Sequence, residues 1–300
     1  MSGSALNGVA EPLAEAAVLA RKWSAQCCTD CHAYHGFWPF MRLMGLGKTL
    51  SGMPELYLKG MTEHFLNHLK ESGGTPVRVL ISGCADASAL AHVLEASRLS
   101  GIAVAVTALD RCETPLRLCA WYAQQLSLSI TSCREDIMAH NAHASYDLIV
   151  TSSFLGYFSP AERPALFQHY AQLLAPGGLI LFGNRLRPGD ETQPVGFSAA
   201  QAGAFGEQAA GRSTQLPEIA GLSADQARSM AREYATRFRS YPLSSADSLH
   251  RLATQAGLIC HIESVPAAPA RAGSASGPTL ADGSGYVFVR LSKPMGTPPT

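Results

Sequence analysis

The sequence lacks net charge, long hydrophobic runs and a secretory leader pattern. Lys and Arg number 23 and so do Asp and Glu, so no overall field attracts a polyanion or an anionic membrane surface. No stretch approaches the roughly 20 uncharged apolar residues that a bilayer span requires. The first residues lack a basic segment followed by an apolar one. These absences argue against nucleic acid and membrane partners, and we expect a cytoplasmic protein.

The cysteines are too scattered for a disulfide framework. Eight cysteines lie between positions 27 and 260, which is typical of a chain in a reducing compartment. No fixed-period repeat is present. A chain of 300 residues can bury one large α/β core with an appended element. A homodimer is compatible with the sequence, although nothing in it specifies one.

From residue 77 onward, short β-branched runs alternate with amphipathic stretches, the pattern of a doubly wound α/β core. The runs predict strands over 77–83, 102–110, 128–133, 147–152 and 178–183, the last after a Pro176-Gly177 turn. Apolar residues at spacings of three and four predict helices over 87–99, 113–126, 160–174 and 245–256. Two more strands are expected over 258–265 and 286–291.

Two regions stand outside this alternation. Residues 1–76 are expected to form a helical cap, and residues 189–243 a helical insertion containing a helix over 224–239. The main domain then runs over 77–293, and 294–300 form a tail. Because ligands of open α/β sheets bind beyond the carboxyl ends of the strands, we assign substrate selection to these two additions.

Small and acidic residues follow the first three strands. Gly83 opens a turn before a helix whose free N–H groups can hold a carboxylate, although a plain tight turn explains this glycine equally well. Asp110 ends the second strand, where an acid can accept hydrogen bonds from ribose hydroxyls; locally, it could instead cap the next helix. Asp136, just past the third strand, can accept from an adenine amino group beside the apolar Ile137.

With these positions, residues 77–188 resemble a class I, Rossmann-like S-adenosylmethionine-dependent methyltransferase. The turn at 173–178 resembles the one before the family's fifth strand, and the final strand pair resembles its antiparallel seventh strand. The resemblance implies a mostly parallel seven-stranded sheet and S-adenosylmethionine as cofactor. It implies cofactor contacts from the strand tips, at Gly83, Cys84, Ala85, Asp86, Asp110, Arg111, Asp136, Ile137, Ser152 and Phe154.

The first strand departs from the family pattern. Ile81 stands where an acid is usual, and Ala85 and Ala87 stand where two glycines often lie. Alanine still allows close backbone approach, but the contact to the cofactor amine is left without an obvious residue. Asp86 is the candidate to supply that charge. The same missing glycines argue against a dinucleotide site.

Residues 27–42 concentrate cysteine, histidine and aromatic side chains. Cys28, Cys31, His32 and His35 suggest a metal, but a structural site usually joins two separated ligand pairs and these fall within nine residues. We therefore predict no metal site. Phe37, Trp38, Phe40 and Met41 are interpreted as a docking face for the sheet.

The polar residues of this segment need partners if they are buried. We expect Arg42 or Tyr34 to meet the cofactor carboxylate, and His35 to face the substrate as a base or orienting group. A core histidine bonded to a carbonyl is the alternative. Tyr157, beyond the fourth strand, is a second substrate-side candidate that could equally serve packing.

These features predict a methyltransferase that acts by direct displacement on a small molecule with an O, N or S acceptor. A nicotinamide-dependent oxidoreductase and a catalytically silent, partner-binding subunit are the alternatives. The acceptor is not readable from the sequence, since one fold serves many acceptors.

Overall fold

The computed structural model describes residues 11–29, 31–46, 52–72, 74–187, 189–215, 221–265 and 285–295. A seven-stranded sheet forms its centre, with the strand order β3-β2-β1-β4-β5-β7-β6. The strands are β1 (Val77–Ser82), β2 (Val104–Asp110), β3 (Thr131–Arg134), β4 (Tyr146–Ser152), β5 (Leu174–Leu186), β6 (Ile259–Val265) and β7 (Gly285–Ser292). Strands β1 to β5 are parallel and β7 is antiparallel to both neighbours. The predicted fold class is confirmed.

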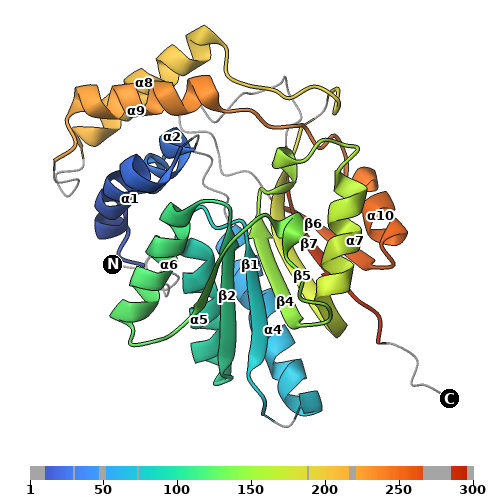
Figure 1. Ribbon diagram of the computed structural model, residues 1–300. Helices are drawn as coiled ribbons and strands as arrows, with labels where there is room; N and C mark the ends of the chain where they lie inside the picture. Colours follow the sequence, from blue (N-terminus) through green and yellow to red (C-terminus); the bar gives the residue numbers. More distant parts are fainter. Residues whose placement is uncertain are drawn as a thin grey trace, which may run out of the picture.

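Helices cover both faces of the sheet (Figure 1). One face packs against α4 (Met53–Ser72), α5 (Ser88–Ser100) and α6 (Glu113–Gln125). The other packs against α7 (Arg163–Leu173) and α10 (Ala246–Gln255). In β1, Val79 and Ile81 enter the first core while Leu80 enters the second. This alternation follows from the two-residue period of a strand.

A third core lies above the carboxyl edge of the sheet. It joins α3 (Trp38–Leu43) to α8 (Ala199–Ser213) and α9 (Ala224–Arg237), which cross the top of the molecule in Figure 1. Helix α1 (Leu13–Cys27) contributes Ala17 to this core and also packs on Leu118 of α6 through Ala16 and Ala20. The short α2 (His32–His35) links α1 to α3. We call these five helices the cap.

Several boundaries differ from the expected ones. Strand β5 begins at Leu174, before the expected turn, and its pairing with β4 shifts between Tyr146 and Leu148. Gly177, with φ +74°, lies within this irregular stretch. Helix α7 begins at Arg163 and not at 160. Helix α8 carries no specific sequence prediction, although Ser198 caps it through a reciprocal box with Gln201.

A buried arginine attaches the inserted segment 189–243 to the core. Arg163 is 1 % exposed and donates to Glu191 at 2.7 Å, near the start of the segment. It also donates to the carbonyls of Tyr241 and Pro242, at its end. One side chain of α7 therefore holds both ends of the insertion.

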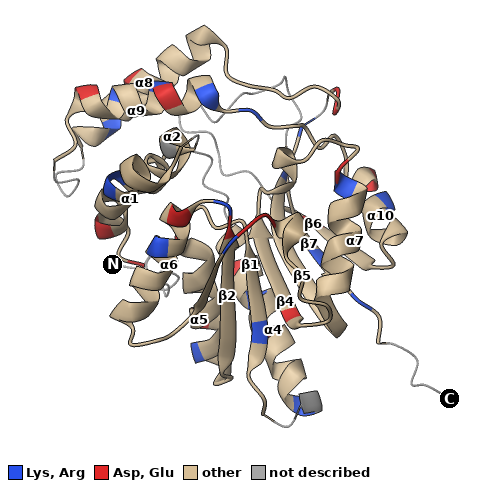
Figure 2. Ribbon diagram, in the orientation of Figure 1, with Lys and Arg blue, Asp and Glu red and all other residues tan. Residues whose placement is uncertain are grey.

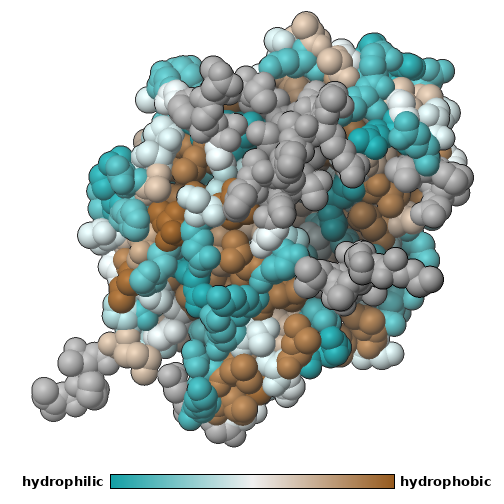
Figure 3. Space-filling view, turned by 180° about the vertical axis from the view of Figure 1, so that it is seen from behind, coloured by the Kyte–Doolittle hydropathy of each residue, from teal (hydrophilic) through white to brown (hydrophobic). Residues whose placement is uncertain are grey.

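The outer surface mixes hydrophobic and hydrophilic residues. No helix among the described residues is long and apolar enough to span one. Seen from behind, brown hydrophobic areas are interrupted by teal hydrophilic residues (Figure 3). The exposed large hydrophobics, such as Leu66 and Leu69 of α4, are about 41 % exposed each.

A bidentate ion pair fixes the amino end of β4 to β1, and it generates a stability prediction. Arg78 donates from its backbone N, Nε and Nη2 to Asp147 at 2.7–3.0 Å. Although burial raises the pKa of Asp147, the hydrogen bonds and charge of Arg78 lower it below its ordinary value. We expect Asp147→Asn to lower the free energy of unfolding by about 1–2 kcal/mol at neutral pH. This value is in the lower part of the range for hydrogen bonds between charged groups, because Arg78 is half exposed and solvent weakens the pair.

Denaturant titrations at several pH values measure this effect. The pKa of Asp147 is lower in the folded state, so its stabilisation is present above the unfolded pKa and is lost as the pH falls through the folded one. The difference between wild type and variant must therefore shrink in acid. Glu95→Gln, which breaks a pair with the exposed Arg98 one turn along the same helix, should change stability little. An equal effect of the two substitutions would contradict the assignment.

Candidate active site

The predicted cofactor turn follows β1 and lies under the cap. Gly83 has φ +73°, and its N–H donates to the carbonyl of Leu109 at 2.9 Å. A Cβ built on Gly83 would lie 2.5 Å from ring atoms of Phe154, so this position has no room for a side chain. Phe154 itself follows β4. The turn therefore brings the tips of β1, β2 and β4 together.

The next two positions of the turn can serve a ligand mainly through their backbone. Cys84 is 1 % exposed, and its Sγ faces the carbonyls of Ile81 and Leu109 at 3.8 and 3.7 Å. Ala85 is half-buried. Neither side chain offers a charge, which leaves Asp86 as the acid of this turn.

Asp86 is buried in an ion-pair cluster with the cap. Its side chain is fully buried, forms a short ion pair with Arg42 and accepts from the N–H of Ser88 at 2.9 Å. Arg42 also donates to both carboxylate oxygens of Glu11, at 3.1 and 2.8 Å. Although burial raises the pKa of Asp86, the charge of Arg42 and the bonds from Ser88 lower it. Arg42 thus lies at the turn, where its partners are two carboxylates; its contact with the cofactor carboxylate stays a prediction.

The acids after β2 and β3 lie on adjoining loops. Asp110 pairs with Arg134 in the parallel register, and the N–H of Glu135 donates to the Asp110 carbonyl at 3.1 Å. Oδ1 of Asp110 accepts from the N–H of Cys112 at 2.7 Å. Burial raises the pKa of Asp110 to about 6. Cys112 is the N-cap of α6, so Asp110 does not cap that helix.

Asp136 has a local role as well as a suitable position. It caps the short 3-10 helix η1 (Ile137–Ala139) by accepting from the N–H of Met138 at 2.9 Å. Its Oδ2 lies 3.7 Å from Nε of the exposed Arg111. Ile137 is 2 % exposed and packs in the second core, so little of it can contact a ligand. Figure 2 shows charged segments gathered near the upper ends of the central strands, below the cap.

The fourth strand ends in an exposed, polar stretch that meets the cap. Ser152 and Ser153 are exposed, and Ser153 has φ +51°. Tyr157 belongs to the following 3-10 helix η2 (Leu155–Tyr157) and is 54 % exposed. Burial raises the pKa of Tyr34, and the nearby Tyr157 adds to this shift. Tyr34 also stacks on Trp38, with ring centroids 5.4 Å apart.

His35 has neighbours other than those the sequence suggests. It is 6 % exposed, its ring contacts Tyr34 edge to face, and its Nδ1 lies 3.7 Å from Sγ of Cys28. It therefore faces a group of thiols at the side of the cap. Phe37, Phe40 and Met41 pack mainly against α8 and α9 in the third core, with Trp38 beside it, so the docking face meets the insertion and not the sheet. The side chain of His32 lies outside the described residues.

Sequence reasoning missed three contributors to this region. Glu11 forms an ion pair with Arg42, and Cys112 lies beside Asp110. Tyr57 of α4 bridges β4 and β5: its hydroxyl donates to the carbonyl of Thr151 at 2.7 Å and accepts from the N–H of Gly183. The contacts of Glu11 and Tyr57 join residues far apart in the sequence, whereas Cys112 lies only two residues after Asp110. No local pattern around Glu11 or Tyr57 could have signalled their pairing.

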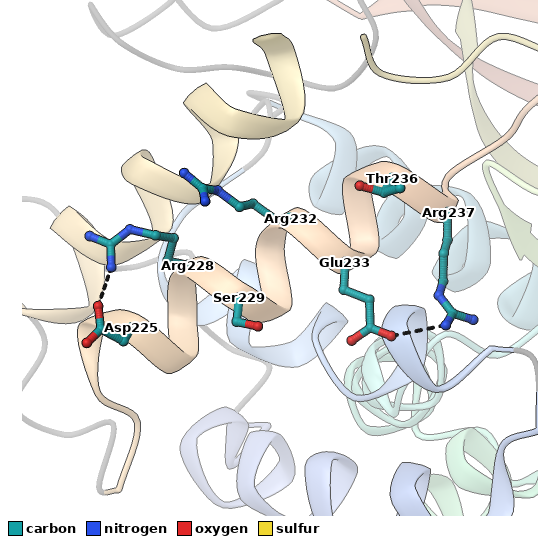
Figure 4. Close-up of a pocket in the computed structure, with 7 residues that line it drawn as sticks. All are labelled: Asp225, Arg228, Ser229, Arg232, Glu233, Thr236 and Arg237. Carbon is teal, nitrogen blue, oxygen red and sulfur yellow. Dashed lines mark hydrogen bonds and ion pairs between the residues drawn. The ribbon is translucent and has the colours of Figure 1, made fainter. Parts of the chain in front are cut away.

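A surface groove elsewhere on the cap does not form this site. It runs along the outer side of α9, lined by Asp225, Arg228, Ser229, Arg232, Glu233, Thr236 and Arg237 (Figure 4). Its charges pair with one another or with α8: Arg228 with Asp225 and Glu207, and Arg237 with Glu233. The charges of this groove are therefore largely neutralised by neighbouring charges.

Comparison with known proteins agrees with this arrangement. Residues 79–178 match the family described as Methyltransferase domain. The solved structure of 1,6-didemethyltoxoflavin-N1-methyltransferase from Burkholderia thailandensis, with 1,6-didemethyltoxoflavin and S-adenosylhomocysteine bound, has a TM-score of 0.51 at 15% identity; the match covers 93% of this chain and 89% of that one. Magnesium protoporphyrin IX methyltransferase from Synechocystis PCC 6803, with bound S-adenosylhomocysteine, has a TM-score of 0.47 at 13% identity, over 93% and 99% of the two chains. No match was found among curated proteins.

The fold, the strand order and the family match together assign the chain. Residues 79–178 carry a methyltransferase domain, and the sheet has the fold of the class I, Rossmann-like methyltransferases, whose methyl donor is S-adenosylmethionine. The resemblance drawn from the sequence is confirmed. The individual site residues stay predictions.

The Gly83 turn generates a prediction that has a matched control. Gly101 has a similar φ of +70°, but a Cβ there would meet nothing within 4 Å. We expect Gly101→Ala to cost about 1 kcal/mol of stability from backbone strain. Gly83→Ala adds the collision with Phe154 and should cost about 1–3 kcal/mol more. Thermal unfolding of both variants measures the difference, and equal destabilisation would show that Phe154 does not restrict this turn.

Proposed function

We propose that the protein transfers the methyl group of S-adenosylmethionine to a small molecule held between the cap and the carboxyl edge of the sheet. The observation that carries this proposal is the ion pair between Arg42 of the cap and Asp86 of the β1 turn. It seats the cap directly on the turn that this class uses for its cofactor. A substrate reaching the transferring methyl would then lie among cap residues.

The donor set fits the cofactor at both of its ends. Asp110 offers a carboxylate for the ribose hydroxyls, and Asp136 an acceptor for the adenine amino group on the adjoining loop. The methionine end is a zwitterion, and the cluster of Glu11, Arg42 and Asp86 offers charges of both signs. Arg42 would hold the carboxylate of that end and the acids its ammonium. In this assignment, the carboxylates of Glu11 and Asp86 take the place of the acid that the family usually has in β1, where this chain has Ile81.

Alignment and exclusion of water are the tasks left to the protein. S-adenosylmethionine supplies an electrophilic methyl group on a sulfonium, and attack by the acceptor displaces the thioether directly, which requires positioning more than proton transfer. Ser152, Phe154 and Tyr157 of the loop after β4 would border the acceptor. Tyr34 and Trp38 of the cap would cover it from above. The buried indole Nε1 of Trp38 lacks a hydrogen-bond acceptor among the described residues, and a substrate oxygen or nitrogen would provide one.

Several observations support a small acceptor over a macromolecule. The cap has its own hydrophobic core, built from two separate segments of the chain, and it stands over the strand tips. Aromatic side chains, including Tyr34, Phe37 and Tyr234, pack on one another within it. The chain has no net charge to attract a nucleic acid. The acceptor atom, O, N or S, is not specified by these features.

The ribose assignment is tested by calorimetric titration with S-adenosylmethionine. We expect Asp110→Asn to weaken binding about 10- to 100-fold, because a hydrogen bond to a charged group contributes about 1.5–3 kcal/mol. Asp110→Ala should weaken binding at least as much. Glu95→Gln, on α5 and paired with Arg98, serves as the control and should bind like wild type. Unchanged affinity in both Asp110 variants would remove this residue from the cofactor site.

The acceptor class is tested with labelled S-adenosylmethionine and a cell extract split by ultrafiltration. We expect label to enter the low-mass fraction, where mass spectrometry identifies the product. Label confined to protein or nucleic acid would contradict a small acceptor. Cofactor binding without any transfer would indicate a silent, partner-binding subunit. A change in NAD(P)H fluorescence, with no S-adenosylmethionine bound, would indicate an oxidoreductase.

A further inference from the structure

Four metal-binding side chains converge at the side of the cap, next to the predicted ribose site. Cys28, Cys31, His35 and Cys112 each place one ligand atom within 4.8 Å of the other three. Sγ of Cys28 lies 3.0 Å from Sγ of Cys112 and 3.7 Å from Nδ1 of His35. All eight cysteines of the chain are free thiols. The convergence therefore comes from non-covalent folding alone.

The four residues come from two separate parts of the fold. Cys28 ends α1, Cys31 precedes α2, and His35 is the last residue of α2. Cys112 lies 84 residues beyond Cys28, in the loop between β2 and α6. Sequence analysis predicted no metal because its candidates fell within nine residues. The fold adds the distant ligand that a structural site normally requires.

The position of Cys112 is itself informative. It is the N-cap of α6, yet its side chain makes no capping hydrogen bond. Serine, threonine, aspartate and asparagine are the preferred residues there because they accept from the helix N–H groups. Here the side chain is a thiol, and it is directed to Cys28 and His35 instead. Thr114, on the same helix, has its hydroxyl 3.0 Å from Sγ of Cys28 and lies beside the cluster.

The donor types and their spacing match tetrahedral zinc. With Zn–S bonds of about 2.3 Å and a Zn–N bond of about 2.0–2.1 Å, the ligand atoms of a Cys3His site lie roughly 3.5–3.8 Å apart. Separations of this order are present before any ion binds. Thiols also form weak hydrogen bonds, so three of them beside one buried imidazole gain little from one another.

The second cluster of this kind among the described residues has an ordinary explanation. Cys133, Glu135 and His140 also approach one another. However, His140 bonds Glu135 through Nδ1 at 2.5 Å and the hydroxyl of Tyr146 through Nε2 at 2.8 Å. Both ring nitrogens are therefore used, and the group has only three members. It does not form a comparable site.

We propose that Cys28, Cys31, His35 and Cys112 bind one zinc ion that fastens the cap to the loop carrying Asp110. Four protein ligands leave no open position for substrate, so the ion is structural and takes no part in methyl transfer. The N–H of Cys112 donates to Oδ1 of Asp110 at 2.7 Å. The ion would therefore hold the predicted ribose acceptor and the cap in one arrangement. Zinc binding itself does not depend on the proposed function.

Metal analysis of the full chain, purified under reducing conditions, tests the site. We expect about one zinc per chain by inductively coupled plasma mass spectrometry. Cys112→Ser and His35→Ala should lose most of this zinc, while His35→Cys, which keeps four ligands, should retain it. Cys27→Ser is the matched control, since Cys27 neighbours Cys28 and lies outside the cluster; it should bind zinc like wild type.

Cobalt titration of the chelator-treated wild type gives a readout that does not depend on whether a variant folds. We expect the intense ligand-field bands of tetrahedral cobalt and a thiolate charge-transfer band, both removed by added zinc. A weak octahedral spectrum, a zinc-free protein from zinc-supplemented cells, or iron in place of zinc would overturn the proposal. A Cys28–Cys112 disulfide in the peptide map of freshly purified protein would overturn it as well.

Discussion

The packing of the cap on the sheet depends on a carboxylate that is buried in the turn after β1. The side chain of Asp86 is fully covered, and an isolated buried charge is too costly to persist. Arg42 provides the opposite charge, and Arg42 belongs to the cap. The fold of the methyltransferase domain is therefore completed electrostatically by a segment more than forty residues earlier in the chain. Glu11, on the other side of Arg42, extends the link to the start of α1.

This link explains why the cap and the sheet form one site. The loops that follow β1, β2 and β4 lie below α8 and α9 (Figure 1). Two contacts attach the cap to different strand tips: Arg42 to the β1 turn, and the thiol cluster to the loop after β2. A third attachment is through Gly156, whose carbonyl accepts from the N–H of Tyr241 at the end of the insertion. Loops that would otherwise move independently are thus held against one structure.

The sheet was predictable because its signal is local. Runs such as 77–83 and 147–152 are apolar on both faces and bounded by turns, and they became β1 and β4 with shifts of one residue. Helix α8 escaped prediction because glycine and alanine weaken its periodicity. Gly206 is nevertheless required there, since a Cβ would meet Cγ of Arg232 on α9 at 2.7 Å. That reason exists only after the two helices have packed.

The candidate site also has a part that local sequence predicts and a part that only the folded chain defines. Position along the strands predicted Gly83, Asp110 and Asp136 as neighbours, because strand tips of a parallel sheet share an edge; their contacts with the cofactor stay predictions. The segment 27–42 was correctly chosen as chemically unusual, but the partners of its residues were not readable. Arg42 meets Asp86 and Glu11, and His35 meets Cys28, through contacts that only the folded chain creates.

The most direct test of the central claim is a crystal structure of the protein with S-adenosylhomocysteine. We expect the ribose against Asp110, the adenine beside Asp136, and the amino-acid end among Glu11, Arg42 and Asp86. A ligand bound at this edge with its amino-acid end directed away from Arg42, or bound outside the space below the cap, would contradict it.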